Sequence, residues 1–327
     1  MGNYIIELNK LLPGDIVLVR DDRPTSKAVR EATHSQYSHA LLYTGYANYI
    51  DAGKIVKSGN LQRKIFKEAD DACVLRLQPS FFYPFAVMRA IMYARLQVGT
   101  LYSMRDAYKM KEGCADKPED NRQICTRLIA YAYKEMKLVE NPDFSTPEDI
   151  FNSKKLIHID DFMREASEDE IDFSKSYSVI DNQSEILYNM LKNAQKATNS
   201  DIQSLAQMVS FDVNNQGYDD CLCDIVVKSG YLDIWKKEEE INSYNYNVSE
   251  FKDKYSKSLN ESAKTIIHSS ILEKERYQFE RDGLTYLLSK NPIKLRLLVI
   301  LRDLYDQLIV HTDRRIKVAE MATNIQR

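Results

Sequence analysis

The chain has 327 residues, of which 44% are hydrophobic and 28% charged, and its formal net charge is −3 at pH 7. This is ordinary globular composition, and the length allows two domains with a core that needs no disulfide or metal. The nearly balanced charge provides no basic field, so nucleic acid is not expected as a partner.

No segment of the sequence predicts export or a membrane span. The start, MGNYIIELNKLLPGDIV, has no basic region followed by a long apolar stretch, and the longest apolar run, LLVIL at 297–301, is too short to cross a bilayer. The cysteines are odd in number, which favours reduced thiols: Cys73, Cys114, Cys125, Cys221 and Cys223. We therefore expect a cytoplasmic protein, and delivery into another cell by a signal-less route stays open.

Residues 1–165 are predicted to form an α+β domain, a small antiparallel sheet packed on helices. Helices are predicted at 26–34, from Pro84 onward, and over RQICTRLIAYAYKEMK (122–137), where apolar residues recur at helical spacing. Runs rich in Val, Leu, Ile and Tyr, bounded by Gly, Asp or Pro, predict strands at 15–20, 39–45, 48–53, 72–78 and 154–160.

Beyond residue 165 the sequence predicts almost only helices. The acidic, polar stretch 166–184 is interpreted as a linker, and residues 185–327 as an all-α domain or a long helical hairpin. A charge-rich helix is expected from about 248 to 283, either as a solvated face or as a docking surface for a protein partner. The final helix is predicted to begin with Asn291 as its cap and Pro292 at its first position.

His39 opens the apolar run HALLYTG, and its best candidate partner is Cys125, near the start of an amphipathic helix. There the unpaired N–H groups and the helix dipole favour the thiolate. A histidine within hydrogen-bond reach would form a thiolate–imidazolium pair, and the backbone N–H of Cys125 could serve as an oxyanion donor. Taken alone, His39 is more often a packed or surface residue and Cys125 a small buried hydrophobe.

Asp51 is the candidate to orient the imidazole of His39. In an antiparallel hairpin these two odd-numbered residues share a face only if the numbers of paired residues sum to an even value. A pairing of Tyr43 with Tyr49 does this, places Leu41 opposite Asp51, and makes His39 and Asp51 diagonal neighbours roughly 5–8 Å apart at Cβ. A register slipped by one residue would separate them, and Asp51 before Ala-Gly would then be a simple turn residue.

Six short motifs follow one another over about residues 11–165, in this order: LLPGDIVLV, YSHALLYTG, YIDAG, VGTLYS, ICTRLIAYAY and TPEDIF. They resemble the circularly permuted branch of the NlpC-type papain-like cysteine hydrolases. The YiiX-like proteins are the nearest group, and lecithin:retinol acyltransferase is a more distant relative. The resemblance implies a permuted papain-like domain with Cys125 as nucleophile, His39 as general base and Asp51 as the polar third residue. The third position is often Glu or His in the family, and the residue after the nucleophile is often serine.

Further candidates for the oxyanion site or the substrate pocket are Tyr37, Ser38, Tyr102 and Thr126. Such tyrosines are more often half-buried packing residues. No second Cys/His pair has zinc-site spacing, and no phosphate-binding, dinucleotide-binding or H-E-x-x-H motif occurs, so neither a metal nor a cofactor is expected.

The sequence therefore predicts a thiol hydrolase that cleaves an amide (peptide or isopeptide) or ester bond through an acyl-enzyme on Cys125. The resemblance favours peptidase or amidase chemistry. One alternative is a lipid acyltransferase or hydrolase of the same fold. The other is a non-catalytic interaction protein whose helical domain docks a partner.

Overall fold

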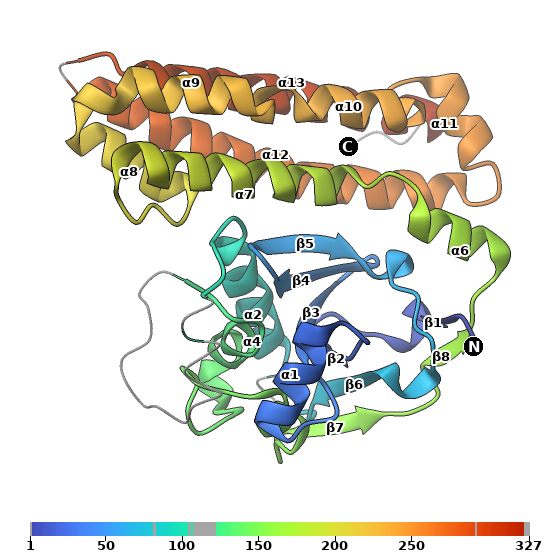
Figure 1. Ribbon diagram of the computed structural model, residues 1–327. Coiled ribbons are helices and arrows are strands. Elements are labelled where there is room, and N and C mark those ends of the chain that lie inside the picture. The colour runs from blue at the N-terminus through green and yellow to red at the C-terminus, as the bar shows by residue number, and fades with distance from the viewer. Residues whose placement is uncertain (1, 81–82, 104–105, 107–121, 292, 324–327) are drawn as a thin grey trace. The chain divides into compact units, whose positions relative to one another are not determined.

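The computed structural model describes residues 2–80, 83–103, 106, 122–291 and 293–323. The chain forms two compact units, Met1–Ser184 and Glu185–Arg327. The first contains strands and helices, and the described part of the second contains helices alone (Figure 1). The N-terminal unit is thus the predicted α+β fold with a small antiparallel sheet.

The main sheet of the N-terminal unit has six antiparallel strands in the order β5–β4–β3–β2–β6–β7, and a separate pair joins β1 to β8. All five predicted strands are present. The sequence of β5, VKSGN, gives little strand signal, because only its valine has high strand propensity. The strands are β1 Tyr4–Ile6, β2 Ile16–Val19, β3 His39–Gly45, β4 Asn48–Ala52, β5 Val56–Asn60, β6 Ala72–Leu77, β7 Leu156–Ile159 and β8 Met163–Glu165.

The side chains of the main sheet contribute to two cores, one on each face. Leu18 and Leu42 belong to the core that also contains the buried residues of helices α2 and α4, whereas Val17 and Leu41 belong to the other. The alternation follows from the two-residue period of a strand. The helices of this unit are α1 Pro24–Thr33, α2 Tyr83–Gln97, α4 Cys125–Ala132, α5 Pro147–Phe151 and α6 Glu168–Lys175.

A tight turn joins β3 to β4. Tyr46 and Ala47, its central residues, have φ of 51° and 64°, the left-handed conformation that two-residue hairpin loops use to match the twist of their strands. Neither residue is a glycine, so the turn costs some local strain. The turn fixes which residues of the two strands lie opposite each other.

The Gly-Asp pair that precedes β2 has a structural role. Gly14 has a φ of 94°, and a Cβ at this position would lie 2.8 Å from the hydroxyl of Tyr133. Asp15 is fully buried, and the guanidinium of Arg76 donates to both of its carboxylate oxygens, at 2.8 and 2.7 Å. A buried carboxylate requires such a partner.

The stretch 166–184, for which the sequence suggests a linker, contains α6 and the beginning of α7 (Val179–Thr198). The guanidinium of Arg63 lies 4.3 Å from the ring centre of Phe173 and donates to the backbone carbonyls of Phe173, Ser176 and Tyr177. These contacts hold the end of α6 against the segment that follows β5.

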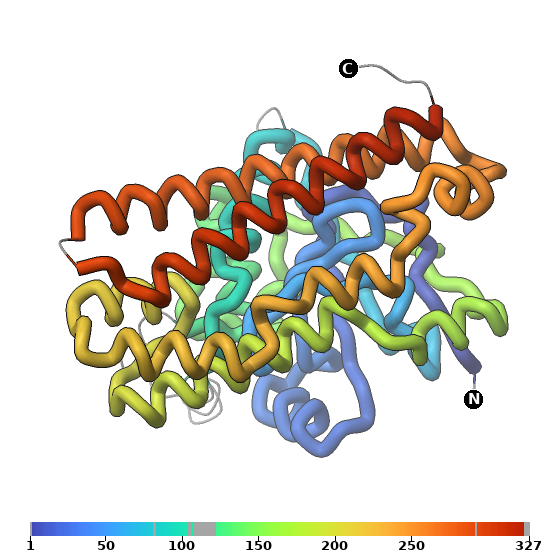
Figure 2. The backbone as a smooth tube through the Cα atoms, turned by 90° about the horizontal axis from the view of Figure 1, so that it is seen from above, coloured from blue at the N-terminus to red at the C-terminus, as the bar shows by residue number. Residues whose placement is uncertain are grey.

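In the C-terminal unit the two longest helices, α12 and α13, lie side by side (Figures 1 and 2). The charge-rich region is interrupted at 255–258, between α11 and α12. None of the described helices is both long enough and apolar enough to cross a bilayer. The remaining helices are α8 Leu205–Asn214, α9 Asp219–Ser229, α10 Ile234–Ile241, α11 Val248–Lys254, α12 Leu259–Lys290 and α13 Arg296–Thr323.

The predicted start of the final helix is wrong. Asn291 is the C-terminal cap of α12, and α13 begins at Arg296; Pro292 lies outside the described residues. The carboxylate of Asp219 accepts the backbone N–H groups of Arg296 and Leu297, at 2.8 and 2.9 Å. The cap of α13 therefore comes from a distant helix, which a local capping pattern cannot reveal.

Candidate active site

The hairpin β3–β4 brings His39 and Asp51 together. Tyr43 pairs with Tyr49 and Leu41 with Asp51, which is the register that the spacing of the two candidate residues requires. The Nε2 atom of His39 lies 2.8 Å from Oδ2 of Asp51, and the Asp51 side chain is buried. The hydrogen bond fixes the plane of the imidazole and leaves Nδ1 as the ring nitrogen for another partner.

Cys125 is the first residue of α4. The residue before it, Ile124, contributes no side-chain cap, so the first amides of the helix have no acceptor within it and the sulfur lies at the positive end of the dipole. The backbone N–H groups of Ala40 and Thr126 also hydrogen-bond to the sulfur. Each of these features favours the thiolate.

The thiol of Cys125 and the imidazole of His39 stabilise each other in their charged forms. Burial raises the pKa of Cys125, but the charge and hydrogen bond of His39 outweigh burial, and the net pKa is lowered from the usual 9.0. Burial likewise opposes protonation of His39, yet the negative charges of Cys125 and Asp51 raise its pKa from 6.5 to about 10. Opposite shifts of this kind are those expected of a thiolate–imidazolium pair at neutral pH.

Asp51 is a buried carboxylate in a positive environment. Burial raises its pKa, but the hydrogen bond and charge of His39, followed by the charges of Lys64 and Lys57, lower the pKa below 3.8 overall. Lys57 lies directly opposite Asp51 on β5 and forms an ion pair with Asp181. Lys64 lies over the ring of Tyr49, 4.9 Å from its centre. Neither lysine can be identified as a site residue from the sequence, since neither belongs to a recognisable motif.

A buried ion pair stabilises the beginning of α4. Nη1 of Arg127 donates to Oδ2 of Asp106 at 2.7 Å, and both side chains are buried. The same guanidinium donates to the carbonyl of Arg122. The hydroxyl of Thr126 donates to the carbonyl of Ser145. The side chains that follow Cys125 therefore anchor the helix, and Thr126 contacts the sulfur through its backbone N–H.

The other pocket candidates have different surroundings. The charge of Cys125 contributes, after burial, to the raised pKa of Tyr102, so this ring lies near the thiol. Tyr37 lies 5.7 Å from Phe151 between ring centres, and its hydroxyl hydrogen-bonds to Cys73. The hydroxyl of Ser38 lies 2.6 Å from that of Ser26. Among the four candidates, Tyr102 and the amide of Thr126 are those found beside the sulfur.

A second cysteine–histidine contact provides an internal comparison. Sγ of Cys73 lies 3.6 Å from Nδ1 of His158. Burial raises the pKa of Cys73 to about 11, although a hydrogen bond from Tyr37 opposes the shift. A histidine neighbour is therefore not sufficient to activate a thiol. Cys125 differs because it has a helix N-terminus, two backbone donors and a histidine paired with a carboxylate.

Among the described residues, one acidic cluster has the spacing of a metal site. The carboxylate oxygens of Glu68, Asp70 and Asp71 lie within 4.8 Å of one another. Arg20 forms ion pairs with all three, at 3.7, 2.9 and 2.8 Å. The guanidinium already supplies the positive charge that a cation would bring, so the cluster is explained as an ion-pair network.

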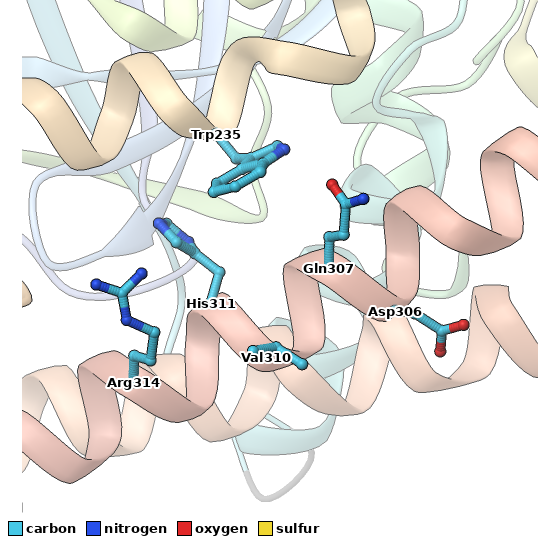
Figure 3. A pocket seen from close by; sticks show the side chains of 6 residues that line it. All are labelled: Trp235, Asp306, Gln307, Val310, His311 and Arg314. Atoms are coloured by element: carbon cyan, nitrogen blue, oxygen red, sulfur yellow. The ribbon is translucent and has the colours of Figure 1, made fainter.

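A concavity of about 290 Å³ lies in the C-terminal unit (Figure 3). Trp235 of α10 packs edge-to-face on His311 of α13, with 5.3 Å between ring centres. Burial and then the charge of Arg315 lower the pKa of His311 to about 4. The wall is largely apolar, and none of its residues belongs to the His39–Cys125 pair: Trp235, Asp306, Gln307, Val310, His311 and Arg314.

No protein-family model matches the sequence, and no curated protein is significantly similar to it. Among solved structures, the chain is similar to YiiX of Escherichia coli O157:H7, which is described as a metalloprotein. The sequences are 19% identical, and the match covers 46% of this chain and 97% of that one, with a TM-score of 0.36.

Proposed function

We propose that this chain is a thiol hydrolase that cleaves an amide (peptide or isopeptide) or ester bond through an acyl-enzyme on Cys125. The observation that supports this most directly is the charged pair. Cys125 begins a helix, its pKa is lowered, and His39 beside it is held by Asp51 at 2.8 Å. The order of these residues, with the histidine strand before the cysteine helix, is that of the permuted papain-like fold, which is part of the proposal.

In the acylation step, the thiolate of Cys125 attacks the substrate carbonyl carbon and forms the C–S bond. The carbonyl electron pair moves onto oxygen, and the backbone N–H of Cys125, which has no acceptor within the helix, is the candidate donor to that oxyanion. His39 then gives its Nδ1 proton to the leaving amine or alcohol as the bond to it breaks.

In the deacylation step, water attacks the thioester carbonyl while Nδ1 of His39 accepts its proton. The C–S bond breaks, the acid product leaves, and the thiolate–imidazolium pair is restored. Asp51 stays ionised throughout because its pKa is lowered, and its role is to hold the imidazole in one orientation.

The nature of the acyl acceptor distinguishes this proposal from its alternatives. If an alcohol or amine replaces water, the same intermediate gives a lipid acyltransferase. If no acyl-enzyme forms, the chain is an interaction protein, for which the helical unit would be the docking module. A protein partner for that unit stays a prediction.

The experiment is to measure the rate of iodoacetamide labelling at each cysteine from pH 5 to 9 by mass spectrometry, in the wild type and in His39→Ala. Cys125 should label with an apparent pKa well below 8.5, and this pKa should rise in the variant. Cys73, buried beside His158 with a raised pKa, is the control within the same sample. Equal, slow labelling of Cys125 and Cys73, unchanged by the substitution, would exclude the hydrolase.

A further inference from the structure

Helix α2 exposes four large apolar side chains, whereas the side chains that it buries fully are smaller. The buried residues are Val87, Ala90 and Ala94. Four large apolar side chains are exposed and are called the α2 stripe: Phe85 (60%), Met88 (52%), Met92 (54%) and Leu96 (79%). The spacing of three, four and four residues aligns these four side chains on one face of the helix.

The packing of the N-terminal unit accounts for the small residues but not for the stripe. α2 packs against α4, and a close approach of two helices favours alanine and valine at the contact. The outward face has no such constraint, and a large exposed apolar patch on a folded protein generally marks an interaction site. The stripe spans about 17 Å along the helix axis.

The charges of α2 indicate which partner suits the stripe. The helix contains Arg89 and Arg95 and no acidic residue. At about 100° per residue, these arginines lie one on each side of the stripe. Arg89 approaches Glu135 at 3.7 Å, but both side chains are more than 65% exposed, and such a surface pair is weak. An apolar face with arginines on both edges has the pattern of a helix that lies in a lipid headgroup region.

We propose that the α2 stripe docks on an anionic phospholipid surface. The four apolar side chains enter the boundary between headgroups and acyl chains. The stem of Arg89 lies along that boundary, and its guanidinium group hydrogen-bonds to a lipid phosphate. This docking is a property of α2 itself and does not depend on the chemistry of Cys125.

The test is co-sedimentation of the full chain with vesicles of phosphatidylcholine alone or with 30% phosphatidylserine, at low and physiological salt. Binding should require the anionic lipid, and the double variant Met88→Gln/Met92→Gln should weaken it at least 10-fold. Arg89→Gln should also weaken it and reduce its salt dependence. Met88 and Met92 are exposed, so thermal unfolding should be unchanged in the methionine variant.

Phe279→Gln on α12 is the matched control. Phe279 is 77% exposed, but the residues three and four positions away from it are Glu275, Arg276, Asp282 and Gly283. No apolar side chain therefore lies directly next to it on the helix surface, and vesicle binding should be unchanged. Failure of the wild type to sediment with anionic vesicles, or sedimentation that the methionine variant leaves intact, would overturn the proposal. A wild-type dimer that this variant makes monomeric, without vesicle binding, would assign the stripe to self-association instead.

Discussion

Nε2 of His39 is bound to the buried carboxylate of Asp51 at 2.8 Å, which leaves Nδ1 as the only ring nitrogen that can exchange a proton with Cys125. The carboxylate therefore determines which atom of the imidazole is available for chemistry. It also contributes negative charge that, with Cys125, raises the pKa of His39 to about 10. Both effects can be tested separately, because one depends on geometry and the other on charge.

Asp51→Asn keeps the size of the side chain and removes its charge. The pKa of His39 should fall, because one of the two charges that raise it is lost, and the imidazolium will then lose its proton at lower pH. Turnover of an activated ester should decrease roughly 100-fold or more, and the alkaline limb of the pH–rate profile should move to lower pH. Asp70→Asn, at an exposed carboxylate paired with Arg20, should leave both unchanged. A turnover equal to that of the wild type would contradict the role of Asp51.

Lys64 should limit how strongly Asp51 stabilises the imidazolium. A cation near the carboxylate repels the protonated His39, so Lys64→Met should raise the pKa of His39 and move the alkaline limb of the pH–rate profile for ester turnover to higher pH. Lys57→Met is the matched control, because the charge of Lys57 is already paired with Asp181, and its effect should be smaller. Equal shifts in the two variants would show that Lys64 has no special relationship to Asp51.

The sequence could predict the part of the site that depends on local geometry. Side chains alternate between the two faces of a strand, so His39 and Asp51 can share a face only if the numbers of paired residues sum to an even value. The observed pairing of Leu41 with Asp51 meets this condition. The position of Cys125 in the first turn of its helix likewise followed from the apolar pattern after it.

Contacts between distant segments could not be predicted in this way. Lys64 reaches the region of Asp51 only because the segment after β5 folds back over Tyr49, and nothing in its own neighbourhood in the sequence indicates that. Cys73 and His158 are 85 residues apart and meet only because β6 pairs with β7. A single sequence indicates which face of a helix or strand is apolar, but it does not indicate which other helix or strand packs against that face.

The ion pair between Arg127 and Asp106 should be a main determinant of the stability of the N-terminal unit. Arg127→Met removes the guanidinium that lies 2.7 Å from the fully buried carboxylate of Asp106, and removal of one member of a buried pair costs about 3–5 kcal/mol. Denaturant unfolding will measure this loss. The double variant Arg127→Met/Asp106→Leu should recover part of it, because the buried carboxylate is removed together with the guanidinium. Arg89→Gln, which breaks only the exposed contact with Glu135, should cost about 1 kcal/mol at most.

Asp212 should make the stability of the C-terminal unit depend on pH. Its side chain is fully buried, and among the described residues no donor reaches either carboxylate oxygen. Burial and the nearby charge of Asp219 raise its pKa from 3.8 to about 7. The folded state therefore holds this proton more tightly than the unfolded chain does. The stabilisation is complete below pH 3.8 and is lost as the pH rises through 7.

Asp212→Asn should remove that dependence, because the amide can donate to Asp219 at any pH as the protonated acid does. The variant should therefore gain more in melting temperature at pH 8 than at pH 5, and thermal unfolding at the two values will measure the difference. Asp220→Asn changes an exposed carboxylate that pairs with Arg296 and should have a small effect at both values. An Asp212→Asn effect of the same size at pH 5 and pH 8 would mean that Asp212 does not titrate in this range. The carboxylate of Asp219 caps α13. When Asp212 holds a proton it is neutral, so no second negative charge is buried beside the carboxylate that caps this helix.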